Sequence, residues 1–147
     1  MHCIRILEIT SCKMVASQAG MFGDGKLEAF DEWLSSQPRG IWPKDFLYSE
    51  SGAFRWAYLW SEGMAVPEEF EIIDWPGGLY AVATDADGET DKSAMDSAVM
   101  DFIGKCGFER DLSRPELGNV ITPPSAAEIM GFSQMDYWYP IKQKGLP

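Results

Sequence analysis

Apolar side chains follow strand spacing and helix spacing in an order that occurs twice along the 147-residue chain. Alternating positions predict strands, and positions three and four apart predict helices. The first half predicts one or two strands, a helix and two further strands, over residues 4–17, 24–37, 45–49 and 54–60. The second half predicts two strands, a helix and two strands, over residues 70–74, 79–84, 91–106, 118–122 and 134–142.

This order predicts an α+β fold in a single domain over residues 1–147, with pseudo-repeats at about 4–62 and 68–142. Each repeat has the order strand, helix, strand, strand. Two such units would pair into one antiparallel sheet with both helices on one face. The other face of the sheet, or the cleft where the units meet, would then be open to a ligand.

Three polar residues stand where helices are expected to begin. Asp24 and Asp91 precede the two long helical stripes, and a carboxylate at that position caps free backbone N–H groups. Ser125 and Glu128 match a capping box, which predicts a single helical turn that stops at Gly131.

Charge and cysteine content exclude several classes of protein. A formal net charge of −11 argues against direct contact with nucleic-acid phosphates. Three widely spaced cysteines and the single His2 favour neither a disulfide framework nor a zinc site. The acidic loop at 85–91 departs from the calcium-loop pattern, because Ala83 and Ala94 fall on ligand positions. We therefore expect no metal and no cofactor. Because the chain has no long apolar run and no leader pattern, we expect a cytoplasmic protein without membrane contact.

The closing strand over 134–142 places an acid among aromatic rings. Alternation sends Asp136 and Trp138 to one face of the strand, and Tyr137 and Tyr139 to the other. A carboxylate in such surroundings either lies at a wet edge or is partly desolvated and needs a partner. We interpret Asp136 as an acid of the second kind, while a role in capping a backbone amide stays open.

A second group of rings lies on one face of the strand predicted over 54–60. Its members alternate along the strand and are Phe54, Trp56, Tyr58 and Trp60. Such a face is typical of a packed core, and the alternative is that some of the rings line a ligand cavity.

Two segments resemble the GyrI-like small-molecule-binding family. They are Trp75-Pro76-Gly77-Gly78-Leu79-Tyr80-Ala81-Val82 and Met135-Asp136-Tyr137-Trp138-Tyr139-Pro140-Ile141-Lys142. The first is similar to that family's strand entry, and the second to its closing strand. The helix positions and the doubled element order agree as well, so the resemblance covers the chain from about Lys13 onward.

The resemblance implies the effector-binding domain of AraC-type or MerR-type transcription regulators. Such a domain takes lipophilic, often cationic, compounds in multidrug sensing, and its DNA-binding partner domain is separate. The family's buried glutamate corresponds to Asp136, which is one methylene shorter. Aromatic faces and a carboxylate together suit a cation. The predicted ligand-binding residues are Trp56, Tyr58, Trp60, Tyr80, Asp136 and Trp138.

Two other functions stay open. Some similar standalone proteins hydrolyse cyclopropane-bearing natural products, and in this chain Asp136 would then activate water, with Tyr58 or Tyr80 as the proton donor. The other alternative is a module that docks another protein through exposed aromatic residues. Because one acid and a tyrosine are few groups for catalysis, ligand binding is favoured over an enzyme.

Overall fold

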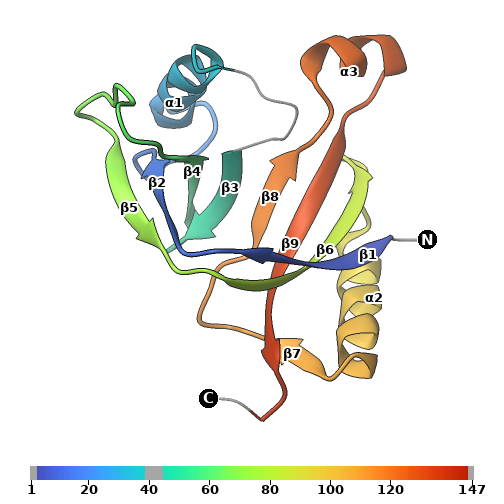
Figure 1. Ribbon diagram of the computed structural model, residues 1–147. Helices are drawn as coiled ribbons and strands as arrows, with labels where there is room; N and C mark the ends of the chain where they lie inside the picture. The colour runs from blue at the N-terminus through green and yellow to red at the C-terminus, as the bar shows by residue number, and fades with distance from the viewer. Residues whose placement is uncertain (1–2, 39–44, 146–147) are drawn as a thin grey trace. The chain divides into compact units, whose positions relative to one another are not determined.

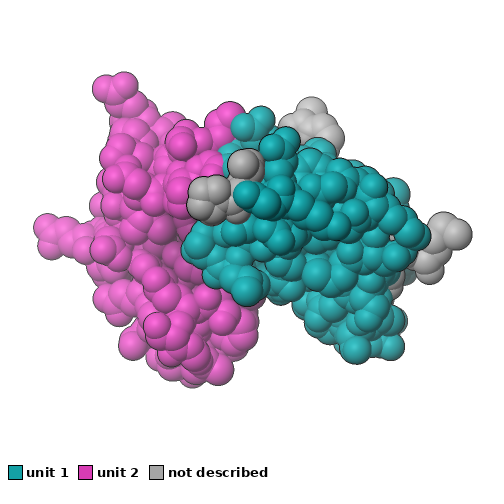
Figure 2. Space-filling view, turned by 90° about the horizontal axis from the view of Figure 1, so that it is seen from below, with its two compact units in different colours: residues 1–9, 78–147 teal, residues 10–77 magenta. Residues whose placement is uncertain are grey.

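The computed structural model describes residues 3–38 and 45–145. The chain divides into two compact units, coloured separately in Figure 2. Unit 1 comprises Met1–Ile9 and Gly78–Pro147, and unit 2 comprises Thr10–Gly77. Unit 2 is thus one continuous segment that interrupts unit 1 after its first strand.

Unit 2 is an antiparallel sheet with one helix (Figure 1). Its strands are β2 (Cys12–Ala16), β3 (Asp45–Glu50), β4 (Ala53–Leu59) and β5 (Glu71–Trp75), in the spatial order β3-β4-β2-β5. Its helix is α1 (Lys26–Ser35). Phe30 of α1 packs with Val15, Tyr58 and Phe70 in the core of the unit.

Unit 1 is likewise built of antiparallel strands, with two helices (Figure 1). Its strands are β1 (Ile4–Ile9), β6 (Gly78–Ala86), β7 (Phe108–Arg110), β8 (Leu117–Val120) and β9 (Gln134–Gln143). The spatial order is β1-β6-β9-β8, and β7 pairs with the end of β9. Its helices are α2 (Lys92–Lys105) and α3 (Pro124–Met130).

The two faces of β9 have different surroundings. Tyr139 and Ile141 point toward α2, where Met95, Val99 and Ile103 complete the apolar core of unit 1. Because neighbouring strand residues point to opposite faces, Asp136 and its neighbours of the same parity lie on the face away from α2. The apolar core thus occupies one side of the sheet and leaves the acid on the other.

The α+β class and the antiparallel pairing predicted from the sequence are confirmed. Asp91 caps α2 as predicted, since its side chain accepts the backbone N–H of Ala94. The predicted cap of α1 is wrong, because the left-handed Gly25 occupies that position, while Asp24 accepts the N–H of Lys26. The predicted capping box is also wrong: α3 begins at Pro124, so Ser125 lies inside its first turn.

Within the described ranges, 3–38 and 45–145, no helix is long and apolar enough to cross a membrane.

Arg114 ties the beginning of β6 to the end of β9 in unit 1. Its guanidinium donates to the carbonyl oxygens of Leu79 and Ile141, each at 2.9 Å, and lies 4.7 Å from the ring centroid of Tyr80. Asp111 accepts from its Nε at 2.8 Å. The guanidinium passes directly against Gly78, where an added Cβ would lie 2.3 Å from Nη1. Any side chain introduced at position 78 would therefore clash with the guanidinium of Arg114 in its present place.

We expect Gly78→Ala to lower the free energy of unfolding by about 1–3 kcal/mol, because the new methyl group must displace a guanidinium held by three hydrogen bonds. Urea denaturation measures this loss. The matched control is Gly104→Ala within α2, where the added Cβ lies 3.9 Å from its nearest neighbour. That control should be stabilising by up to about 1 kcal/mol through helix propensity. Equal stability of Gly78→Ala and the native protein would contradict the close contact.

Candidate functional site

Asp136 forms a hydrogen-bonded network with residues of two other strands of unit 1. Its Oδ2 accepts from Nη2 of Arg5 on β1 at 2.8 Å. Its Oδ1 accepts from the hydroxyl of Thr84 on β6, and Thr84 in turn accepts from Nη1 of Arg5 at 3.1 Å. Thr84 lies directly opposite Asp136 in the strand pairing. Three adjacent strands thus each place one polar side chain at the same point of the sheet.

The two charged members of this network differ in exposure. The Asp136 side chain is 5% exposed, whereas that of Arg5 is 39% exposed. The carboxylate is therefore shielded from solvent, and the guanidinium is the member of the pair that reaches water. A carboxylate buried to this extent requires a compensating charge, because transferring an unpaired ion out of water costs several kcal/mol. Arg5 supplies that charge.

An aromatic patch adjoins the acid on the same face. The Trp138 indole donates from Nε1 to Oδ1 of Asn119 at 2.8 Å, and Asn119 on β8 lies opposite Asp136 in the pairing. Tyr80 packs edge-on against Trp138 with 5.8 Å between ring centroids. The site therefore combines an acid paired with Arg5, a half-buried indole held by Asn119 and a phenol ring that is fully buried. We call this set the Asp136 face: Arg5, Tyr80, Thr84, Asn119, Asp136 and Trp138.

Of the six predicted ligand-binding residues, three lie on the Asp136 face and three lie in unit 2. Trp56, Tyr58 and Trp60 belong to the cluster around Phe30 of α1. The ring of Tyr58 meets Trp33 of α1 edge-on at 5.9 Å. These positions match the packed-core alternative for the rings of β4.

A second acid accompanies the rings of β4. Asp45 of β3 accepts the indole N–H of Trp56 at 3.0 Å and lies opposite Tyr58 in the strand pairing. Burial raises the pKa of the Asp45 carboxyl and, with Asp45 nearby, the pKa of the Tyr58 phenol. Both groups are therefore held toward their neutral forms, and Tyr58 is a poor source of a phenolate.

The groups proposed for hydrolysis are not assembled within unit 1. Tyr80 stands opposite Pro140 in the strand pairing, four residues along β9 from Asp136, and Trp138 lies between them. Both oxygens of Asp136 are engaged by Arg5 and Thr84 rather than by a tyrosine.

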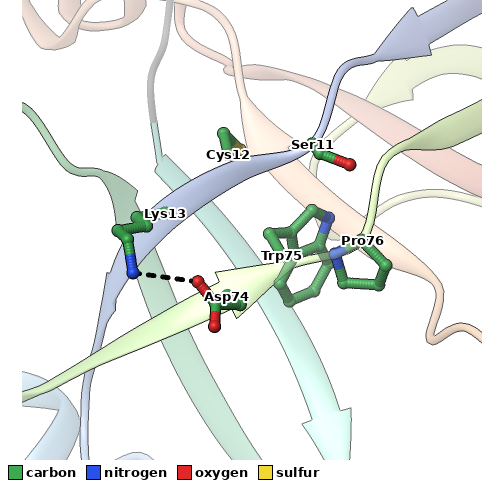
Figure 3. A pocket seen from close by; sticks show the side chains of 6 residues that line it. All are labelled: Ser11, Cys12, Lys13, Asp74, Trp75 and Pro76. Carbon is green, nitrogen blue, oxygen red and sulfur yellow. Dashed lines mark hydrogen bonds and ion pairs between the residues drawn. The ribbon is translucent and has the colours of Figure 1, made fainter.

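A surface pocket in unit 2 has different chemistry. It measures about 480 Å³ and is lined by Ser11, Cys12, Lys13, Asp74, Trp75 and Pro76 (Figure 3). Lys13 and Asp74 form an ion pair of 3.0 Å at its edge. Burial raises the pKa of the Cys12 thiol, so this cysteine is not activated as a nucleophile. The pocket therefore gives no reason to assign it a reaction.

Sequence reasoning missed Arg5, Thr84 and Asn119. A signal for Arg5 was present, since it is a single charged residue between Ile4 and Ile6 in an apolar strand. A charge in such a place must reach either solvent or a partner. The partner lies 131 positions away along the chain, so no local pattern names it.

No family model matches the sequence, and no curated protein matches it. Solved structures are similar in fold. The C-terminal domain of EcmrR is 9% identical over 97% of this chain and 99% of its own, with a TM-score of 0.65. The EcmrR polypeptide solved in complex with DNA is longer, and this chain spans 58% of its length.

SAV2435 bound to tetraphenylphosphonium is 13% identical over 95% of this chain and 94% of its own, with a TM-score of 0.59. A hydrolase from Listeria innocua is 6% identical over 95% and 91% of the two chains, with a TM-score of 0.69. At these identities the similarity establishes the fold. The predicted resemblance to GyrI-like domains is confirmed at that level.

We expect Arg5→Met to lower the free energy of unfolding by about 2 kcal/mol, because it leaves a carboxylate that is 5% exposed without its cation. The loss should be smaller than the ~3–5 kcal/mol typical of fully buried pairs, since water can approach from the side of Arg5. Adding Asp136→Asn should recover most of the loss. The control is Lys13→Met, which removes an exposed ion pair and should change stability by less than about 1 kcal/mol. Chemical denaturation of the three variants would contradict the network if both Met substitutions had equal effects.

Proposed function

We propose that this chain binds a small lipophilic molecule on the Asp136 face of unit 1. The observation that carries the proposal is the buried acid of β9, placed beside Trp138 and Tyr80 on the face away from α2. A packing role alone does not require an acid at this position. An apolar residue there would avoid the cost of desolvating two charged groups.

The half-buried Trp138 gives this face affinity for flat or ring-bearing molecules, whereas Tyr80 is fully buried and packs against the indole. Trp138 is partly exposed and its indole is held by Asn119, so a ligand would meet a fixed aromatic surface. A side chain that is already immobilised loses little further conformational entropy on binding. The polar groups of Arg5 and Thr84 would orient the ligand, as a few polar groups do in most small-molecule sites.

The proposal extends to a role in regulating transcription through a separate DNA-binding domain or partner. Support comes from the fold, which is shared with the C-terminal domain of EcmrR, a protein solved in complex with DNA. The net charge of −11 fits a part of a regulator that does not itself hold nucleic acid. In this proposal the chain acts as the effector-sensing part, as the resemblance to AraC-type and MerR-type multidrug sensors suggests.

A protein-docking function is the second candidate, and α3 is the observation that favours it. This helix contributes no buried side chain, and Ile129, Met130 and Phe132 near its end are 89%, 47% and 44% exposed. Exposed apolar residues grouped in this way are typical of contact surfaces. A dimer that forms as concentration rises, and that Ile129→Glu disrupts, would favour docking over ligand binding.

We expect triphenylphosphine oxide, an uncharged molecule with three phenyl rings, to raise the melting temperature, because ligand binding stabilises the folded state by an amount that grows with the logarithm of one plus the ratio of ligand concentration to Kd. Trp138→Leu should weaken its binding about tenfold, measured by isothermal titration calorimetry, because the ligand loses an aromatic partner. The matched control is Trp33→Leu, which removes an indole from the core of unit 2 and should leave Kd unchanged. The proposal would be wrong if Trp138→Leu bound the compound with unchanged affinity. It would also be wrong if none of a wider panel of ring-bearing compounds raised the melting temperature.

A further inference from the structure

Arg5 supplies the positive charge that lies beside Asp136. Its Nη2 lies 2.8 Å from Oδ2, and its Nη1 donates to Thr84, which itself donates to the other carboxylate oxygen. Both oxygens are thus engaged by the chain's own groups. A cation in solution would have to displace a guanidinium that is covalently tethered, and tethering gives such a group a high effective concentration.

Displacement of Arg5 would also separate opposite charges at a buried point. The Asp136 side chain is 5% exposed, so its attraction to the guanidinium is screened less than that of a surface pair. A bulky cation must lose its own hydration to reach the same carboxylate, and it gains only one ion pair in exchange for another. The net electrostatic gain for an incoming cation is therefore small.

Arg5 lies at a place in the fold where its side chain can be changed without disturbing the apolar core. β1 is an edge strand that pairs with β6, and the strand order ends there. The side chain of Arg5 is 39% exposed, so its head group can be altered without removing an apolar contact of the core. Ile4 and Ile6, its neighbours, supply that core contact on the opposite face.

We propose that Arg5 determines the charge specificity of the Asp136 face. While Arg5 neutralises Asp136, the face takes uncharged ring-bearing molecules in preference to organic cations. Removal of Arg5 alone converts it into a cation site, and removal of the Asp136 charge alone converts it into an anion site. This inference rests on the proposed function, since it concerns the ligand class of the same face.

Tetraphenylphosphonium and tetraphenylborate test this directly, because they have nearly the same shape and opposite charges. Their Kd values are measured by calorimetry for the native protein, Arg5→Gln, Asp136→Asn, the double variant and Arg5→Lys. Arg5→Gln should bind the phosphonium about tenfold more tightly than the native protein, through the freed carboxylate. Asp136→Asn should bind the borate about tenfold more tightly, through the freed guanidinium. The double variant should prefer neither ion.

Arg5→Lys is the matched control, since it keeps a positive charge and should retain the native preference. Triphenylphosphine oxide should bind the native protein, as the proposed function expects. Should Arg5→Gln not fold, the borate affinity of Asp136→Asn decides the matter, and an unchanged value there refutes the inference. Native protein that binds the phosphonium as tightly as Arg5→Gln refutes the inference while leaving the proposed function intact. Binding of none of the three compounds by any variant would end both.

Discussion

A carboxylate out of contact with water must be compensated, and this constraint organises the sheet of unit 1. The compensation of Asp136 requires β1, β6 and β9 to be adjacent and in one register. Thr84 can reach the acid because it stands opposite it, and Arg5 can reach both because it stands opposite Val82, two residues along β6. A register shift by one residue would send these side chains to opposite faces. The polar network therefore specifies the pairing that the apolar residues alone would define less sharply.

The two faces of β9 show how one strand serves two purposes. Toward α2, Tyr139 is buried and its hydroxyl donates to Asp96 at 2.6 Å, while Lys92 donates to it at 2.9 Å. Burial and the hydrogen bond to Asp96 raise the pKa of this phenol to about 12, which keeps it protonated. Its role is to fasten the sheet to the first turns of the helix. Away from α2, the same strand carries Asp136, whose two oxygens accept from Arg5 and Thr84, and Trp138, whose indole donates to Asn119.

Much of this fold follows from local sequence patterns, and what does not follow depends on distant partners. Alternation along 134–142 correctly separates Asp136 from Tyr139, because strand geometry alone fixes which face a residue occupies. It cannot identify Arg5, since the strand pairing that joins them is decided by the whole chain. The three-residue β7 falls below the length at which alternation can be detected. The sequence pattern predicts the cap of α1 at Asp24, one residue before its observed place at Gly25. The cap residue is in the left-handed conformation, which glycine adopts more readily than aspartate.

The aromatic rings of β4 also show what a local sequence pattern leaves undecided. Their spacing places them on one face, but it cannot say whether a helix or a ligand will cover that face. Phe30 and Trp33 of α1 contact Trp56 and Tyr58 and so provide the cover. Aromatic content is thus a weaker guide to a binding site than an acid found among rings. Aromatic rings can pack against one another in a core, whereas a buried carboxylate needs a polar or charged partner.

The interruption of unit 1 by unit 2 has a consequence for biosynthesis. Unit 2 is one uninterrupted stretch, so all its strand pairs can form while the polypeptide is still emerging from the ribosome. β1 leaves the ribosome before unit 2, but it can pair only after β6 has been synthesised. Arg5 can form its ion pair only with a residue 131 positions later in the chain. Pairing across such separations is slow to form. The nascent chain is therefore expected to acquire its inserted half first, and to complete the acid-bearing sheet only after β9 has been synthesised.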